Sequence, residues 1–519
     1  MDVKSYIHSL CRIGEGKEIE FKSAKGGFPA SLWETYSAFA NTDGGIIVLG
    51  ISEKNGKFYP DGLTEDQATK YKKTLWDGLN NKNTVSINLL SDKDVIQAEY
   101  EDSNILIVKV PRAEYTQRPV YLTFNPFGGH MYRRRHEGDY KASDDVVRRM
   151  IGDSLVSSSP LDNKIFKHFE IGDEIDPTTI RQYRQMFTIK HNEHPWKDLP
   201  DLKFLEKIGA YRIDKEEGQE GFTLAGVLMF GTQKGLEDAM PHYFIDYRER
   251  LSKNPEIRWT DRVYPDGYWE PNLYQFYSRV YPKIQQALPT PFKLEGGSRV
   301  DDTPAHNALR EAFINCMVHA VYGMMNCIVI ERYPDRLVFR NPGTMLVSVE
   351  QYFKGGTSIC RNSTLQKIFS FVGGNERAGS GADMIVKAWA DNNWPKPQLL
   401  ELYDPDMVEL TLFVGKQDGR TRVGTEKKTT EKTTEKTTEK TTEKTTEKTT
   451  EKTTEKKINK TREIILDAIK NNPYLTNKEL ATICGITADG VYYQLKQMKT
   501  SGLIRRIGPD NGGHWEIIK

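Results

Sequence analysis

The sequence predicts a multidomain α+β protein, and three observations carry that prediction. Its 519 residues exceed the ~250–300 residues at which single hydrophobic cores stop growing. Stretches with helical periodicity and stretches with strand periodicity both recur along the chain. A polar four-residue repeat sets the C-terminal segment apart from the rest. We therefore expect five segments with these limits: 1–155, 156–300, 301–415, 416–456 and 457–519.

The charge balance excludes a protein that attracts polyanions through its overall field. The chain has 73 Lys and Arg residues against 72 Asp and Glu residues, so any nucleic-acid surface must be local. Its five cysteines contain no C-x-x-C pair, which argues for reduced thiols and against a zinc site or a disulfide framework. The chain lacks a run of ~18 apolar residues and a signal-peptide core. We therefore expect a soluble cytoplasmic protein without membrane contact.

The first segment mixes helices and strands. An amphipathic helix, a turn with paired glycines and a buried strand are predicted by "LWETYSAFANTDGGIIVLGISE", and a further strand by "NILIVKVPRA". A strand or hairpin with three consecutive arginines is predicted by "GGHMYRRRHEGDYKAS". We expect the basic side chains of this segment to grip phosphates, namely Lys22, Lys25, Arg133, Arg134 and Arg135.

The middle segment is predicted as an α/β region, in which "FTLAGVLMFG" forms a strand and "PHYFIDYRE" its neighbour. The third segment begins with a long helix, "HNALREAFINCMVHAVYG", and ends on a strand, "MVELTLFVG". Glu311 and Asn315 are four apart on that helix and therefore lie on the same side. Asn315 can ligate Mg²⁺ through its carbonyl oxygen, and Glu311 can polarise an attacking water. The alternative is an ordinary polar pair on a solvated helix face.

Features downstream of this helix favour a nucleotide site over a solvated pair. A tight turn is expected at Asn341-Pro342-Gly343 after a strand, and a helix is expected to open near Ser363. Gly379-Ser380-Gly381 precedes another helix, where small residues let backbone N–H groups approach a phosphate. This order predicts a site for a magnesium-bound triphosphate.

These motifs resemble the GHKL (histidine-kinase-like) ATPase fold. The resemblance rests on Glu311 with Asn315, the Asn-Pro-Gly turn, Arg361-Asn362, and Glu376 followed by Gly379-x-Gly381. It is strongest to the divergent branch found in bacterial proteins that begin with a Schlafen/Alba-type domain. It implies an α/β sandwich that binds ATP and Mg²⁺, in proteins that often form homo-oligomers through neighbouring helices.

The resemblance also implies roles for individual residues. Glu311 would activate water and Asn315 would hold Mg²⁺. Five residues would contact the nucleotide: Asn341, Gly343, Arg361, Gly379 and Gly381. The chain departs from the pattern of the branch at His319-Ala320-Val321-Tyr322, where His-Arg-Asp-Tyr is usual. It also lacks the Asp with which better-known GHKL enzymes read adenine.

The first segment is similar to the Schlafen/Alba-type (AlbA_2) domain, which binds DNA or RNA. The similarity covers residues 10–150, because "EGKEIEFK", "AFANTDGGIIVLGI" and the arginine-rich strand fall in order. Eukaryotic Schlafen nucleases carry two Glu residues at the spacing of Glu15 and Glu20, plus a downstream Asp. Here Glu53 or Asp43 would supply the third carboxylate, and the three could hold the metals of phosphodiester hydrolysis. Alternatively, Glu20 pairs with Lys22 or an arginine and sets the sheet, and the domain binds without cutting.

A repeat and a winged helix-turn-helix complete the chain. From 429 to 456 the sequence Thr-Thr-Glu-Lys occurs seven times, which predicts a disordered linker because no residue can enter a core. A helix, a short helix capped by Thr476, a longer helix capped by Thr487 and two strands follow. The residues expected to contact nucleic acid are Tyr492, Gln494, Lys496, Lys499, Arg505 and Arg506. The alternative is a module for protein docking or dimerisation.

Together these features predict an ATP-binding, nucleic-acid-binding regulator, of transcription or of a defence-type switch, that couples a nucleotide site to DNA or RNA. One alternative is a metal-dependent nuclease that acts through Glu15, Glu20 and Glu53. The other is a scaffold whose nucleotide site is vestigial.

Overall fold

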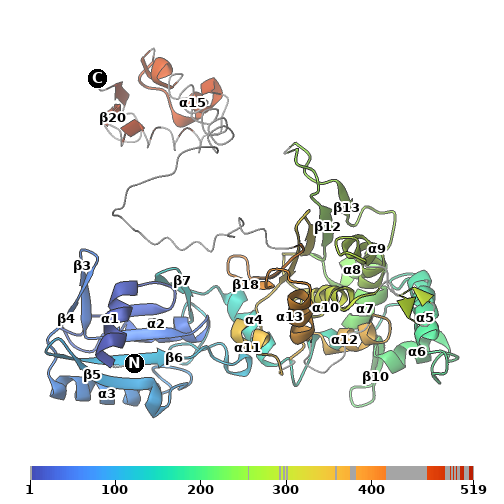
Figure 1. Ribbon diagram of the computed structural model, residues 1–519, viewed down its shortest axis with the longest axis horizontal. Coiled ribbons are helices and arrows are strands. Elements are labelled where there is room, and N and C mark those ends of the chain that lie inside the picture. The colour runs from blue at the N-terminus through green and yellow to red at the C-terminus, as the bar shows by residue number, and fades with distance from the viewer. Residues whose placement is uncertain are drawn as a thin grey trace. The chain divides into compact units, whose positions relative to one another are not determined.

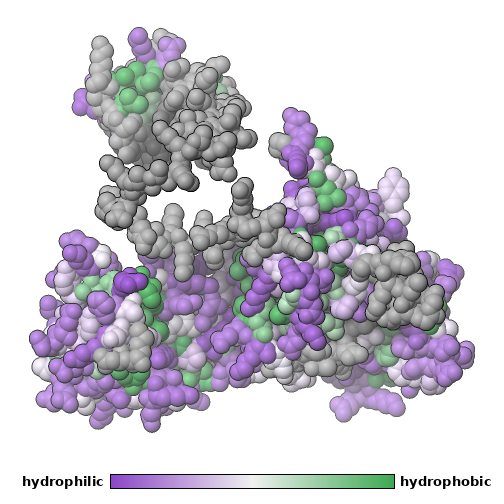
Figure 2. Space-filling model, viewed as in Figure 1, coloured by the Kyte–Doolittle hydropathy of each residue, from purple (hydrophilic) through white to green (hydrophobic). Residues whose placement is uncertain are grey.

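The structure is a computed structural model that falls into two compact units, residues 1–422 and 423–519. It describes most of the first unit and parts of the second, over these residues: 3–254, 256–290, 294–295, 298–299, 302–356, 359–373, 381–415, 465–470, 472–484, 491, 495, 498–499, 503–507 and 514–517. In the described parts, no helix is both long and apolar enough to span a bilayer. Figure 2 shows mainly hydrophilic side chains on the visible face.

The N-terminal domain is built on a four-stranded sheet of order β1-β2-β6-β5, in which β1 and β2 are parallel and the other pairs antiparallel. Its elements are α1 (Val3–Ile13), β1 (Ile19–Lys22), α2 (Leu32–Ala40), β2 (Gly45–Leu49), β3 (Ile51–Lys54), β4 (Lys57–Pro60), α3 (Glu65–Leu79), β5 (Val95–Tyr100), β6 (Ser103–Val110), β7 (Tyr132–Arg135), β8 (Gly138–Lys141) and α4 (Asp144–Ser154) (Figure 1). Successive residues of β2 face opposite sides. Ile47 and Leu49 join the core with α2 and α3, and Val48 joins the core with α1.

A mainly helical region follows, with the elements β9 (Ile165–Phe166), α5 (Pro177–Lys190), α6 (Asp201–Ile208), β10 (Tyr211–Asp214), β11 (Gln219–Thr223), α7 (Leu224–Phe230) and α8 (Gln233–Ala239). The prediction of one strand over "FTLAGVLMFG" is wrong beyond Thr223. The Thr223 hydroxyl accepts a hydrogen bond from Gly226 N at 3.1 Å and so caps the helix α7. Because α7 is buried all round, its apolar run has the composition of a core strand.

The remaining described part of the first unit is dominated by a six-stranded sheet of order β13-β12-β16-β17-β19-β18. Its strands are β12 (Ile245–Glu249), β13 (Asp261–Val263), β16 (Ile328–Arg332), β17 (Arg336–Pro342), β18 (Gln398–Leu402) and β19 (Met407–Phe413). The helices are α9 (Leu273–Gln285), α10 (Pro304–Val318), α11 (Val349–Lys354), α12 (Ser363–Ser370) and α13 (Gly381–Asp391), and a short hairpin is formed by β14 (Leu294–Glu295) and β15 (Ser298–Arg299).

This sheet corrects the predicted boundary at residue 300. β12 lies in the predicted middle segment, yet it pairs in parallel with β16 of the third segment, with Ile245 opposite Ile328. A single hydrophobic core runs from Ile175 to Leu412 and includes side chains from both segments. Residues 156–300 and 301–415 therefore share one sheet and one core. Strand β12 confirms the strand predicted in "PHYFIDYRE", but its neighbours are β13 and β16.

Helix α10 confirms the predicted long helix. Pro304 occupies its first turn, and Thr303 caps it by accepting from His306 N at 3.4 Å. The helix is buried on most sides, with Glu311 buried and Asn315 half-buried, so the pair does not lie on a fully solvated face.

The second unit agrees with the predicted winged helix where it is described. Residues 465–470 are helical, α15 covers Asn477–Cys484, and β20 (Ile504–Ile507) pairs antiparallel with β21 (His514–Ile517). The predicted cap is confirmed, because Thr476 Oγ1 accepts from Glu479 N and Glu479 accepts from Thr476 N. The core includes Ile465, Leu480, Val491, Leu495, Met498 and Ile504. Thr487 lies outside the described residues.

Candidate nucleotide site and nucleic-acid modules

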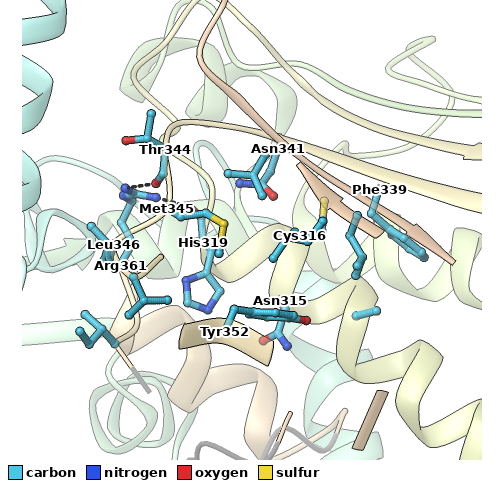
Figure 3. A pocket seen from close by; sticks show the side chains of 16 residues that line it. Asn315, Cys316, His319, Phe339, Asn341, Thr344, Met345, Leu346, Tyr352 and Arg361 are labelled. Carbon is cyan, nitrogen blue, oxygen red and sulfur yellow. Dashed lines mark hydrogen bonds between the residues drawn. The ribbon is translucent and has the colours of Figure 1, made fainter. Parts of the chain in front are cut away.

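A cavity of about 120 Å³ lies between helices α10 and α11 and strands β17, β18 and β19. Most of its lining is apolar, and the polar side chains among the lining residues are Asn315, His319, Asn341, Thr344, Tyr352 and Arg361. In the view of Figure 3, Asn341 and Thr344 lie above His319, and Asn315 and Tyr352 lie below it. The cavity therefore joins the helix that carries Asn315 to the strand that carries Asn341.

Glu311 and Asn315 meet at one edge of this cavity. Asn315 Nδ2 donates to Glu311 Oε1 at 3.0 Å, and Glu311 is only 7% exposed, so the alternative of a solvated pair is wrong. A Cβ atom placed on Gly381 would lie 2.5 Å from Glu311 Oε1 and 3.3 Å from Asn315 Nδ2. The carboxylate, the amide and the first residue of α13 are thus in close contact, as predicted. Gly379 lies outside the described residues.

The residues at this edge fit a hydrated magnesium ion. Glu311 and Asn315 offer carboxylate and amide oxygens, which are the ligand types that Mg²⁺ prefers. The absent Cβ of Gly381 leaves a space against both side chains that any other residue would fill. This geometry is consistent with the predicted roles of both residues, which stay predictions.

The predicted turn at Asn341-Pro342-Gly343 needs correction, because Asn341 and Pro342 still belong to β17 and pair with β19, and the chain bends at Gly343. Gly343 has φ +112°, and a Cβ there would lie 2.6 Å from Val321 Cγ2, so only glycine fits the bend. Its N–H donates to Asp406 O at 3.0 Å. Asn341 is 6% exposed and lines the cavity, where its side chain can both donate to and accept from a ligand.

The predicted nucleotide contact of Arg361 needs correction. Its guanidinium donates to both carboxylate oxygens of Asp153 at 3.1 and 3.0 Å and to His319 O at 2.6 Å. It also donates to Thr344 O at 2.9 Å, and Figure 3 shows Arg361 beside Thr344. The residue is 3% exposed. Arg361 therefore holds the wall of the cavity, and most of its N–H donors are engaged by protein oxygens.

Two titratable groups of the cavity wall, His319 and Tyr352, are held in their neutral forms at physiological pH. Burial, followed by the charge of Arg361, lowers the pKa of His319 to about 4. Burial, followed by the charge of Glu311, raises the pKa of Tyr352 above its usual range. An apolar wall with neutral polar groups suits a planar base better than a phosphate group.

Asp162 caps helix α12, which follows Arg361. Its surroundings make the stability of the fold depend on pH. Its Oδ2 accepts from Thr364 N at 2.8 Å and from Leu365 N at 2.9 Å, while Oδ1 is buried without a partner. Burial raises the pKa of Asp162 from 3.8 to about 6, against the lowering effect of the two N–H groups. Because the folded state holds this proton more tightly than the unfolded state, protonated Asp162 favours folding. This stabilisation is fully present below pH 3.8 and is lost as the pH rises through about 6.

Asp162→Asn is therefore expected to gain stability relative to the parent protein as the pH rises from 4 to 7. Over this pH range, the difference in unfolding free energy between the variant and the parent protein should change by about 3 kcal/mol. The pKa of Asp162 is raised from 3.8 to about 6, and one pKa unit is worth ~1.4 kcal/mol. Urea unfolding of both proteins at several pH values measures it. The exposed Asp145→Asn on α4 serves as the control and should show no such trend. A difference that is independent of pH would contradict the prediction.

The N-terminal carboxylates do not assemble the metal site that the nuclease hypothesis needs. Glu20 accepts from Lys22 at 2.6 Å and from Arg134 at 2.7 Å, which is the pairing that the alternative predicted. Burial, then the charge of Glu20, and more weakly that of Glu53, raise the pKa of Glu15. Nevertheless, wherever side chains are described, no group of three His, Cys, Asp or Glu side chains could hold a metal ion.

The prediction that the three arginines grip phosphates is wrong for Arg133 and Arg134. Arg134 is 1% exposed and donates to Glu20, to Asp139 and to Gly16 O. Arg133 is 2% exposed and donates to both oxygens of Asp406 at 2.8 and 3.2 Å. Arg135 is half-exposed and pairs with Asp404. Buried arginines satisfied by carboxylates join parts of the structure and present no charge to a ligand.

Other predicted nucleic-acid contacts remain available. Lys25 is exposed, whereas Lys22 is mostly buried and pairs with Glu20. In the winged helix Lys499 is exposed, and Arg505 is 60% exposed although it pairs with Glu516 across the hairpin. The side chains of Tyr492, Gln494, Lys496 and Arg506 lie outside the described residues.

Comparison with family models agrees with this division of the chain. Residues 15–143 match "Schlafen, AlbA_2", residues 326–411 match "Putative ATP-dependent DNA helicase recG C-terminal", and residues 458–505 match "Winged helix-turn-helix DNA-binding". Residues 148–246 match a domain of unknown function, DUF8451. No curated protein matches the chain.

Two solved structures resemble parts or all of the chain. The crystal structure of the DIP2311 protein from Corynebacterium diphtheriae is 17% identical, with 99% of this chain and 96% of that chain covered and a TM-score of 0.38. The solution structure of the N-terminal domain of a "Putative ATP-dependent DNA Helicase RecG-related Protein" from Nitrosomonas europaea is 25% identical. It covers 27% of this chain and 94% of that chain, with a TM-score of 0.22.

The matches to family models fall on the regions in which the motifs were found and confirm the predicted fold class. The HATPase-like match covers β16, β17, β18 and most of β19, and the last three of these strands line the cavity. The chain therefore contains three segments similar to known domains, namely the Schlafen/AlbA_2 domain, the recG C-terminal HATPase-like domain and the winged helix-turn-helix domain.

Proposed function

We propose that the protein is an ATP-binding regulator that holds nucleic acid through its N-terminal domain and its winged helix and senses nucleotide in the HATPase-like domain. One observation carries the nucleotide part of this proposal, namely the contact of Glu311 and Asn315 with Gly381 beside a largely apolar cavity. The matches to Schlafen/AlbA_2 and winged-helix models support the nucleic-acid part.

In this proposal the base enters the cavity against Asn341, and the phosphates lie toward Gly381. Helix α13 begins at Gly381, and its N-terminal N–H groups and helix dipole favour a phosphate. Asn315 would hold Mg²⁺ through its amide oxygen, and the ion would neutralise the phosphate charge. Glu311 would orient water near the terminal phosphate.

The proposal predicts that Mg·ATP stabilises the chain and that Asn315→Ala removes the effect. At a concentration of 100 times Kd a ligand stabilises the folded state by ~2.7 kcal/mol. Thermal unfolding with and without Mg·ATP measures this for each variant. Asn307→Ala is the matched control, because Asn307 is exposed on the same helix and does not line the cavity. No stabilisation of the parent protein at high excess would overturn the proposed nucleotide site.

The winged helix is predicted to bind duplex DNA with a salt dependence to which Arg505 contributes. Arg505→Ala should flatten the plot of log K against log salt by about one unit, which is the value for one phosphate contact. Glu516→Gln should not flatten it, since this change removes the carboxylate that competes with DNA for Arg505. Fluorescence anisotropy at four salt concentrations measures the slopes. Equal slopes for Arg505→Ala and the parent protein would place the hairpin away from DNA.

A further inference from the structure

The loop that follows the Asn-Pro-Gly sequence lines the nucleotide cavity and is held by arginines of the N-terminal domain. Met345 O accepts from Arg112 at 2.9 Å and from Arg118 at 3.1 Å. Thr344 Oγ1 accepts from Arg149 of α4 at 2.7 Å. Thr344 and Met345 both line the cavity, so its wall is fixed in part by side chains from residues 112–149.

Arg112 has two carboxylate partners. It makes a two-bond contact with Glu401 at 2.6 and 3.2 Å, and Glu401 also accepts from Met345 N at 2.9 Å. The Arg112 nitrogen that makes the shorter bond to Glu401 also donates to Asp43 at 3.2 Å. Because both bonds use the same guanidinium, a change in the position of Asp43 alters how Arg112 holds Glu401 and Met345.

Asp43 is in turn paired with an exposed lysine. Lys17 forms an ion pair with Asp43, and the Lys17 side chain is 49% exposed while that of Arg112 is 9% exposed. Lys17 belongs to the stretch before β1, in the region matched to Schlafen/AlbA_2. A row of alternating charges therefore runs from the surface to the cavity wall through Lys17, Asp43, Arg112 and Glu401.

Arg118, which lies beside Arg112 at the inner end of this row, is poorly compensated. Burial, followed by the charge of Arg112, lowers the pKa of Arg118 to about 10. Arg118 is 5% exposed, and within the described structure its Nε has no hydrogen-bond partner. A buried guanidinium in this state gains from any shift that brings a carboxylate closer. The pairing around Met345 is therefore sensitive to where Asp43 and Glu401 lie.

We propose that Lys17 binds a phosphate of nucleic acid, and that this contact reaches the nucleotide cavity through Asp43, Arg112 and the Met345 carbonyl. A phosphate that engages Lys17 removes the cation from Asp43. Asp43 then attracts the Arg112 guanidinium more strongly. As a result, the hydrogen bonds from Arg112 to Glu401 and to Met345 O weaken or change their geometry. This inference rests on the proposed function, and it makes Arg112 a positioning residue of the nucleotide pocket.

The test measures the dissociation constant of Mg·ATP for the full chain with and without saturating duplex DNA, and that of the DNA with and without Mg·ATP. Thermodynamic linkage requires that DNA changes the dissociation constant of Mg·ATP by the same factor by which Mg·ATP changes that of DNA. For two coupled sites this factor is typically ~5–150-fold. We expect the parent protein to show a factor of about 5 or more. Lys17→Ala and Asp43→Asn should each reduce this factor to near one.

Separate readouts keep the variants interpretable. Lys17→Ala should also weaken DNA binding and flatten its salt slope by about one unit, whereas Asp43→Asn should keep the slope. Arg112→Lys keeps the charge but loses the two-bond geometry, so it should change the affinity for Mg·ATP in the absence of DNA. Arg148→Ala is the control, because Arg148 is 64% exposed and its ion pair with Asp145 is local to α4. It should keep the factor of the parent protein.

Failure of the inference differs from failure of the proposed function. If the parent protein binds no Mg·ATP, the proposed nucleotide site fails. If it binds both ligands but neither ligand changes the dissociation constant of the other, the nucleotide site stands and the coupling is overturned. If the factor survives in Asp43→Asn, coupling does not run through the Lys17–Asp43–Arg112 row, and this route is overturned.

Discussion

Arg361→Ala is expected to lower the free energy of unfolding of the first unit by about 3–5 kcal/mol. The substitution removes the guanidinium from the Asp153 carboxylate and leaves that charge buried, since Asp153 is 7% exposed. It also leaves His319 O and Thr344 O without this donor. Breaking a buried pair on one side costs more than the pair itself contributes, because the remaining charge stays desolvated.

Urea unfolding followed by tryptophan fluorescence measures this loss. Arg148→Ala is the matched control on an exposed pair, and we expect it to change stability by less than about 1 kcal/mol. Arg361→Met with Asp153→Leu should recover part of the loss, because neither charge then remains buried. A loss below about 1 kcal/mol for Arg361→Ala would mean that water reaches Asp153 and would contradict the buried pair.

Gly381→Ala is expected to weaken Mg·ATP binding by about 10–100-fold, the range seen when groups that orient a metal ligand are disturbed. The new methyl group would lie 2.5 Å from Glu311 Oε1, so the carboxylate must move away and its bond to Asn315 must change. The chain should stay folded, because the displaced atom is at the end of a flexible side chain. Alanine also favours a helix over glycine.

Isothermal titration with Mg·ATP gives the affinity, and urea unfolding gives the stability of the same preparation. Gly152→Ala is the matched control, because a Cβ on this glycine of α4 would meet no atom within 4 Å. It should keep the affinity of the parent protein. An unchanged affinity in Gly381→Ala would place the nucleotide away from Glu311 and Asn315.

Local patterns predicted much of the candidate site. Helix α10 and the contact of Glu311 with Asn315 follow from a spacing of four residues, and the bend at Gly343 follows from an Asn-Pro-Gly sequence. Such features depend on neighbours in the chain, which the sequence displays directly. The cap at Thr476 was predictable for the same reason.

Features that depend on distant partners could not be predicted. Arg133 and Arg134 belong to a basic run, and such runs usually face solvent. Here both side chains are buried in ion pairs with Asp406 and Glu20, which are far from them in the sequence. Arg112 and Arg118 carry no local signal, because their contacts to Met345 span more than 220 positions. Helix α7 was missed because its residues are apolar on every side and so show no period.

The parallel pairing of β12 with β16 sets a limit on how the chain can be divided for expression. A fragment that starts after residue 300 keeps β16 but loses the strand that satisfies its outer backbone N–H and C=O groups. Such an open edge invites pairing with other molecules, so the fragment should aggregate even though it carries the whole of the matched 326–411 region. Recombinant versions of the HATPase-like domain should therefore begin before Ile245.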